Sequence, residues 1–96
     1  MNPLSPDTKI LYQAILKLKN LAETKAFFRD LLTPQEIDTF SSRFKVVRLL
    51  HQGKPYQEIA RLAKTSTTTV TRVAYWLHRG RGGYRLILNR LFPNKR

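Results

Sequence analysis

Ninety-six residues suit one small domain, and 42% hydrophobic with 10% aromatic residues predict a chain that folds and is not disordered. Eighteen lysines and arginines against six aspartates and glutamates give a net charge of +12, which indicates a polyanionic partner, with nucleic acid as the first candidate. No cysteine and only two well-separated histidines exclude a disulfide framework, a thiolate nucleophile and a metal site made of these side chains, so we expect no cofactor.

Membrane and enzymatic functions find little support in the sequence. No apolar run is long enough to span a bilayer and no segment resembles a secretory signal peptide, so we expect a cytoplasmic, nucleoid-associated protein with no membrane partner. No paired carboxylates and no nucleophile beside a base occur, so we do not expect an enzyme. A chain this short buries a limited share of its surface, which favours a homodimer with a shared core.

Two N-terminal helices are predicted over residues 5–32. Ser5 before Pro6 is typical of a helix start, because the hydroxyl can cap the helix and proline has no N–H to satisfy. Asn20 followed by Glu23 predicts a second start. The second helix is so rich in apolar side chains that we expect it to be buried; these are Phe27, Phe28, Leu31 and Leu32.

A long central helix is predicted over residues 33–53. Its start, Thr33-Pro34-Gln35-Glu36, combines a capping hydroxyl, a proline in the first turn and a glutamate that can return to the cap. Gly53 is expected to end it. One apolar face follows from Ile37, Phe40, Phe44, Val47 and Leu50.

Residues 55–79 have the pattern of a helix-turn-helix. Ala60 is small enough for a close helix crossing, and Val70 and Val73 are spaced to fix the second helix against the first. The glycine usual in the tight turn is missing, and Lys64 stands in its expected place. Two ordinary bundle helices joined by a threonine-rich connection are the alternative.

Polar side chains remain on the outside of the second helix and at its exit. Hydroxyl groups and arginines can donate to phosphates and reach base edges in the major groove. The candidates for DNA contact are Ser66, Thr67, Thr68, Thr71, Arg72, Arg79 and Arg81, with Arg85 nearby. Each arginine alone could be an ordinary surface cation. Tyr75 and Trp76 lie beyond these positions and are interpreted as core residues.

Glycines interrupt the chain before a last helix. Gly80-Arg81-Gly82-Gly83 is interpreted as a hinge or a helix C-cap, and a C-terminal helix is predicted over residues 83–92, ended by Pro93. No strand-like alternation of any length occurs. We therefore expect an all-α fold in a single domain over residues 1–96.

From Leu32 to Leu88 the chain resembles the Trp repressor (TrpR) family. The match rests on Thr33-Pro34-x-Glu36, Arg43, Gly53, Gln57-Glu58-Ile59-Ala60 and Thr69-Val70-Thr71-Arg72-Val73. The Trp-Leu-x-x-Gly-x-Gly-Gly-Tyr segment that ends at Tyr84 resembles the shorter TrpR-like branch of the YerC/YecD type. The resemblance implies an intertwined homodimer whose N-terminal helices interlock and whose two readers enter successive major grooves.

The resemblance also implies an effector pocket. Tryptophan-sensing members hold the amino acid with arginines and threonines, to which Arg43, Arg72, Thr33 and Thr69 correspond. Val73 replaces a glycine of the sensing repressor and Trp76 replaces a serine, and both add bulk. We hypothesise that the protein's own side chains partly fill this pocket, so that DNA binding needs no tryptophan, and another effector remains open.

The sequence thus favours a double-stranded DNA-binding transcriptional regulator, expected to be a repressor that recognises a specific operator. A protein that coats nucleic acid without sequence preference remains the alternative, because the same cations suit any phosphate backbone. A module that binds other proteins is a third interpretation.

Overall fold

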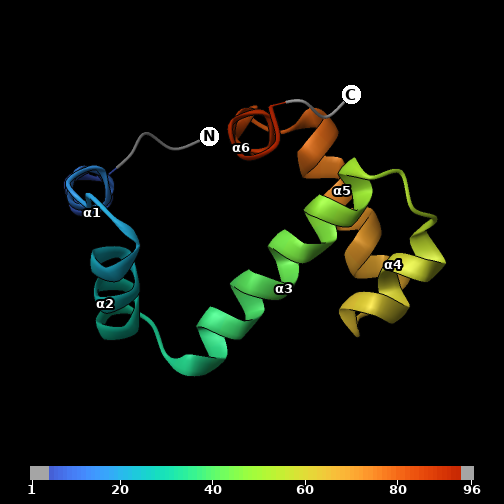
Figure 1. Cartoon of the computed structure of the whole chain (residues 1–96), viewed down its shortest axis with the longest axis horizontal. Helices are drawn as coiled ribbons and strands as arrows, with labels where there is room; N and C mark the ends of the chain where they lie inside the picture. The colour runs from blue at the N-terminus through green and yellow to red at the C-terminus, as the bar shows by residue number, and fades with distance from the viewer. Residues whose placement is uncertain (1–4, 94–96) are drawn as a thin grey trace. The chain divides into compact units, whose positions relative to one another are not determined.

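The computed structural model describes residues 5–93, and this part of the chain contains six helices and no strand (Figure 1). The expected all-α fold is confirmed. None of the helices in this range is both long and apolar enough to cross a membrane. The chain divides into two compact units, Met1–Ile37 and Asp38–Arg96, each of which is described by itself.

The first unit contains α1 (Pro6–Leu16) and α2 (Leu21–Leu31). The Ser5 hydroxyl accepts a hydrogen bond from the Thr8 N–H at 3.1 Å, and the Asn20 side-chain oxygen accepts one from the Glu23 N–H at 2.9 Å. Both predicted helix starts are confirmed, because the capping oxygens satisfy backbone donors that a first helical turn leaves free.

Neither α1 nor α2 contains a buried residue. Leu16 and Leu21 are 82% and 74% exposed. Phe27 and Phe28 are half-buried and meet edge to face, with ring centroids 5.5 Å apart. The expectation that α2 is buried is therefore wrong for the single chain, since two eleven-residue helices are too small to enclose each other's apolar side chains.

Local rules also define the bounds of α3 (Pro34–His51). The Thr33 hydroxyl accepts from the Glu36 N–H at 3.1 Å while the Glu36 carboxylate accepts from the Thr33 N–H at 2.8 Å, which confirms the predicted capping box. At the other end Gly53 has φ +82°, and the Lys54 N–H returns to the Leu49 carbonyl at 3.2 Å. The predicted stop at Gly53 is confirmed as a left-handed glycine cap.

The second unit is built on α3 by α4 (Tyr56–Ala63), α5 (Thr67–Arg79) and α6 (Gly83–Leu91). Its largest fully buried side chains come from all four helices and are Val46, Val47, Ile59, Val70 and Leu88. Burying an aliphatic side chain of this size contributes about 1.5–3 kcal/mol relative to leaving it in water. In Figure 1 the α4–α5 pair accordingly lies beside the C-terminal half of α3.

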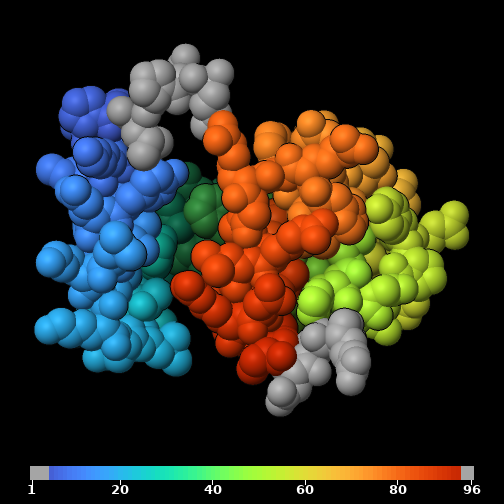
Figure 2. Space-filling view, turned by 90° about the horizontal axis from the view of Figure 1, so that it is seen from above, coloured from blue at the N-terminus to red at the C-terminus, as the bar shows by residue number. Residues whose placement is uncertain are grey.

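The connection from α5 to α6 depends on glycine. The Gly80 N–H donates to the Trp76 carbonyl at 3.0 Å, and a Cβ at Gly80 would stand 2.3 Å from that same oxygen. Gly82 has φ +86°, a conformation that other residues rarely adopt. The interpretation of this segment as a C-cap is confirmed at Gly80. The α6 helix then packs against α5, red against orange in Figure 2.

We predict that Gly80→Ala lowers the free energy of unfolding by about 1–3 kcal/mol, because the new methyl group meets a backbone carbonyl that cannot rotate away. Gly83→Ala is the matched control, since no atom lies within 4 Å of a Cβ built there. Urea unfolding at one fixed protein concentration measures both variants. Equal stability of the two variants would contradict the close approach at Gly80.

Candidate nucleic-acid interface

The turn between α4 and α5 has the left-handed residue that a tight turn requires, although it is not glycine. Lys64 has φ 55°. The Thr65 N–H donates to the Ala60 carbonyl at 2.9 Å, and the Lys64 N–H donates to the Arg61 carbonyl at 3.3 Å, which is the bonding of a left-handed helix cap. The tight turn of a helix-turn-helix is thus formed without glycine, and Lys64 adopts the left-handed conformation that glycine would adopt without strain.

Apolar packing fixes α5 against α4 as the sequence predicts. Ile59 and Val70 are fully buried, and Val73 is 5% exposed. Ala60 is 8% exposed, in keeping with its expected place at the helix crossing. The Ser42 hydroxyl of α3 also donates to the Ala63 carbonyl at 3.4 Å, next to the turn. The orientation of α5 is therefore set from beneath by the core.

The first turn of α5 uses Ser66 for capping. Its hydroxyl accepts from the Thr69 N–H and donates to the Thr69 hydroxyl, both at 3.1 Å. Ser66 remains exposed, but its donor already has a partner within the chain. Beyond the cap, every other predicted DNA contact is exposed; these are Thr67, Thr68, Thr71, Arg72, Arg79 and Arg81.

Arg85 is also exposed, and its guanidinium group makes contacts within the chain. Its Nε donates to the Leu77 carbonyl at 3.1 Å, and a terminal nitrogen lies 3.5 Å from Nδ1 of His78. A cation at the C-terminal end of a helix satisfies a free carbonyl and is favoured by the helix dipole. Arg85 therefore joins α6 to the end of α5.

The interpretation of Tyr75 and Trp76 as core residues is wrong for this chain. Each is 54% exposed, and their rings meet edge to face with centroids 5.2 Å apart. The inward positions of α5 are filled instead by Val70, Val73, Ala74 and Leu77. The helical phase indicates this outcome, since Tyr75 follows Thr68 and Thr71 by seven and four residues and so shares their outward face.

Tyr75 borders a shallow groove on this outward face. The groove has a volume of about 400 Å³ and is lined by Thr68, Thr71, Arg72 and Tyr75. Two hydroxyls, a guanidinium and a phenol thus lie together on one side of the helix. Such groups donate hydrogen bonds to phosphates and base edges.

Charge is concentrated in the second unit. Residues 38–96 contain 13 lysines and arginines against two acids, a net +11, whereas residues 1–37 contain five against four, a net +1. The two acids are Asp38 and Glu58, and Glu58 lies 4.0 Å from Arg61, at the outer limit of an ion pair. Internal pairing therefore neutralises little of the charge around α5.

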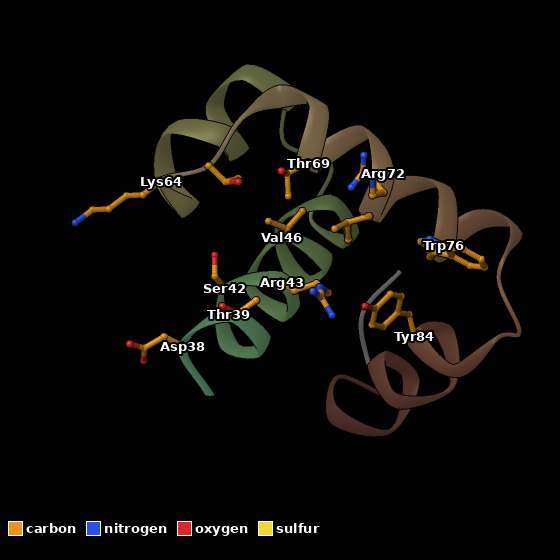
Figure 3. A pocket seen from close by; sticks show the side chains of 12 residues that line it. Asp38, Thr39, Ser42, Arg43, Val46, Lys64, Thr69, Arg72, Trp76 and Tyr84 are labelled. Atoms are coloured by element: carbon orange, nitrogen blue, oxygen red, sulfur yellow. The ribbon is translucent and has the colours of Figure 1, made fainter. Parts of the chain in front are cut away.

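A second hollow of about 700 Å³ lies within the same unit, between α3, the α4–α5 turn, α5 and α6 (Figure 3). We call it the cleft. Its lining combines two arginines, hydroxyl groups, one acid and two aromatic rings; the residues are Asp38, Thr39, Ser42, Arg43, Val46, Lys64, Thr65, Thr69, Arg72, Val73, Trp76 and Tyr84. Arg72 lines both the cleft and the outer groove.

The cleft brings together most of the residues predicted for an effector pocket. Arg43, Thr69, Arg72 and Trp76 all line it, and the Arg43 guanidinium lies 5.6 Å from the centroid of the Phe40 ring. Thr33 is not among the lining residues and caps α3 instead. Val73 and Trp76 are both among the lining residues of the cleft.

The sequence did not indicate Asp38 and Tyr84 as lining residues. Asp38 lies five residues before Arg43, and Tyr84 lies beyond the glycine segment. Only the folded arrangement of α3, α5 and α6 brings these two side chains to the cleft.

Comparisons with known proteins agree with this architecture. The family described as Trp repressor protein matches residues 7–92. YerC of Bacillus subtilis strain 168, a protein without an assigned function, is 38% identical over 81 residues, which are 84% of this chain and 78% of YerC. A TrpR-like protein from Eubacterium eligens ATCC 27750 has a crystal structure with a TM-score of 0.85 and 39% identity, over 91% of this chain and 90% of that one. A Trp repressor candidate from Staphylococcus aureus gives a TM-score of 0.87 and 34% identity, over 97% and 93% of the two chains.

We predict that Lys64→Gly raises the free energy of unfolding by about 0.5–1 kcal/mol, because glycine removes a left-handed strain of about 1–2 kcal/mol and costs about 0.4–1 kcal/mol of chain entropy. Lys64→Ala removes the same charge and keeps the strain, so we expect no gain from it. Urea unfolding compares the two. A gain shared by both variants would point to charge relief instead of backbone geometry.

Proposed function

This chain belongs to the Trp repressor family, and we propose that it is a sequence-specific regulator, a repressor that reads double-stranded DNA with α5. Membership establishes a DNA-binding regulator in general terms, in a family that is not enzymatic. The observation that carries the proposal is the outward face of α5, whose hydroxyls and arginines project from the unit with a net charge of +11.

Within this proposal the candidate residues have two roles. Thr67, Thr68 and Thr71 lie in the first turns of α5, the part of a recognition helix that reaches base edges, where their hydroxyls and methyl groups read the sequence. Arg72, Arg79 and Arg81 bind phosphates and position the helix in the groove. Ser66 contributes by holding the first turn in place.

We also propose that the functional form is a homodimer. The uncovered apolar side chains of α1 and α2 support this, since Leu16 and Leu21 would remain in water in a lone chain. In α6, Ile87 and Leu91 are 40% and 52% exposed as well. A second copy of the chain would cover such faces and supply a second reading helix about one DNA turn away.

DNA binding in this proposal does not require tryptophan. Val70 and Leu77 hold α5 against the core, and Ser66 caps its first turn. The helix therefore has its support within the chain. Val73 and Trp76 add apolar surface to the cleft where a smaller pair of residues would leave more room for an indole. The cleft is left for an effector of other chemistry.

We predict that selection from a random duplex library, without added tryptophan, enriches a palindromic motif whose half-sites are about one helical turn apart. Repeating the selection with tryptophan should return the same motif with unchanged affinity. Binding without enrichment would favour the nucleic-acid-coating alternative, and a motif that appears only with tryptophan would contradict ligand independence.

We predict a steep salt dependence that Arg72→Ala reduces. Each phosphate neutralised contributes about −0.9 to the slope of log affinity against log salt, so loss of one arginine contact should make the slope shallower by about 1. Arg29→Ala is the control, because Arg29 is also an exposed arginine but lies in the nearly neutral first unit. Fluorescence anisotropy on one duplex at several salt concentrations gives all the slopes. An unchanged slope for Arg72→Ala would remove Arg72 from the phosphate contacts.

A further inference from the structure

We infer that Tyr75 is a backbone anchor for DNA, and that its phenol hydroxyl donates to a phosphate oxygen at the wall of the major groove. The inference rests on the proposed function of α5 as the reading helix, and it adds a DNA contact made by a residue whose aromatic ring alone would predict a place in the core.

The first support is the position of Tyr75 around the helix. The buried side of α5 is formed by Val70, Val73, Ala74 and Leu77. Residues spaced by three or four positions share one face of a helix, so Tyr75 falls on the opposite stripe, three residues after Arg72 and four before Arg79. Tyr75 therefore stands between two exposed cations on the outermost line of α5.

The second support is that Tyr75 does little for the fold. Its ring is 54% exposed, and its aromatic neighbour Trp76 is equally exposed. Among the described residues, no hydrogen bond involves the Tyr75 hydroxyl. A large apolar ring displayed with a free donor at its tip suits a contact surface, where tyrosine combines wide contact area with a polar end.

The third support is the distance of Tyr75 from the first turn of α5, because this distance favours a phosphate contact over a base contact. Tyr75 is the ninth residue of α5, so at 1.5 Å per residue it lies about 12 Å along the axis from Thr67. The major groove is itself about 12 Å wide. If the first turn of α5 enters the groove, Tyr75 has reached its wall, where phosphate oxygens accept hydrogen bonds.

A neutral donor has a measurable signature that distinguishes it from the arginines. The tyrosine hydroxyl carries no charge and releases no counterion, so its loss lowers affinity without changing the salt slope. It also carries no sequence information, because phosphates are the same at every base pair. Affinity should therefore fall equally on the selected duplex and on a scrambled one.

The test measures Tyr75→Phe in the full chain, by anisotropy on both duplexes across a series of salt concentrations. We expect about tenfold weaker binding on each, the size of one hydrogen bond to a charged group, and an unchanged slope. Tyr75→Ala should bind at least as weakly. Tyr12→Phe is the matched control, since Tyr12 is 52% exposed in α1 and the change removes an equally accessible hydroxyl. Thermal melting confirms that the variants fold.

Two results would overturn the inference. Wild-type affinity for Tyr75→Phe would exclude a role for the hydroxyl, and a loss confined to the selected duplex would assign Tyr75 to base reading. Failure of the proposed function shows separately in the wild-type protein. If wild-type binding has no sequence preference, the specific-reader proposal fails while the equal loss caused by Tyr75→Phe still supports the anchor. If wild-type protein binds no duplex, both fail.

Discussion

Burial of four β-branched side chains from three helices determines which way α5, the proposed reading helix, faces. Val46 and Val47 of α3, Ile59 of α4 and Val70 of α5 are all fully buried in one cluster. β-Branched side chains have few rotamers, so once they interlock the helices lose freedom to rotate about their own axes. The inward side of α5 is then fixed. The outward side of α5 and the side that lines the cleft are therefore left for its hydroxyl groups, Arg72 and the exposed rings of Tyr75 and Trp76.

The concentration of positive charge in the second unit must be offset by the stability of that same core. The second unit holds a net +11 in 59 residues, and self-repulsion among like charges destabilises any compact state. The unit contains only two acids, so ion pairs can offset little of this repulsion. Apolar burial and helix caps must offset the rest as long as no polyanion is bound. Bound DNA would relieve it, so DNA binding and folding stability are thermodynamically linked in this unit. The first unit, with a net +1 and uncovered apolar side chains, is suited to contact with another apolar surface.

The sequence predicted what depends on neighbouring residues and failed where a position depends on the fold. The caps at Ser5, Asn20 and Thr33 follow from side chains three residues apart, and the stop at Gly53 from one residue's freedom. The predicted burial of α2, Tyr75 and Trp76 was wrong, because composition counts apolar residues without showing what covers them. The α2 helix is exposed because its unit has no element that covers it. Tyr75 and Trp76 are exposed because smaller residues fill the inward positions of α5. Lys64 shows the opposite case, in which surrounding contacts impose a conformation that the residue type disfavours. The residues that assemble the cleft, Tyr84 above all, depend on helix packing that no local rule contains.

The cleft and the outer groove share one side chain, Arg72, and this sets how the two could communicate. A single guanidinium cannot satisfy a cleft ligand and a phosphate with the same donors at once, yet a ligand that fixes its orientation can also favour the phosphate contact. The sign of the coupling therefore depends on which nitrogens the ligand occupies. Linkage makes the effect reciprocal: whatever factor a cleft ligand applies to DNA affinity, DNA applies to the affinity of that ligand. Because the core already holds α5 from beneath, such a ligand would act mainly on the side chains at the boundary of the two hollows, Arg72 first, and the backbone of the reading helix would change little.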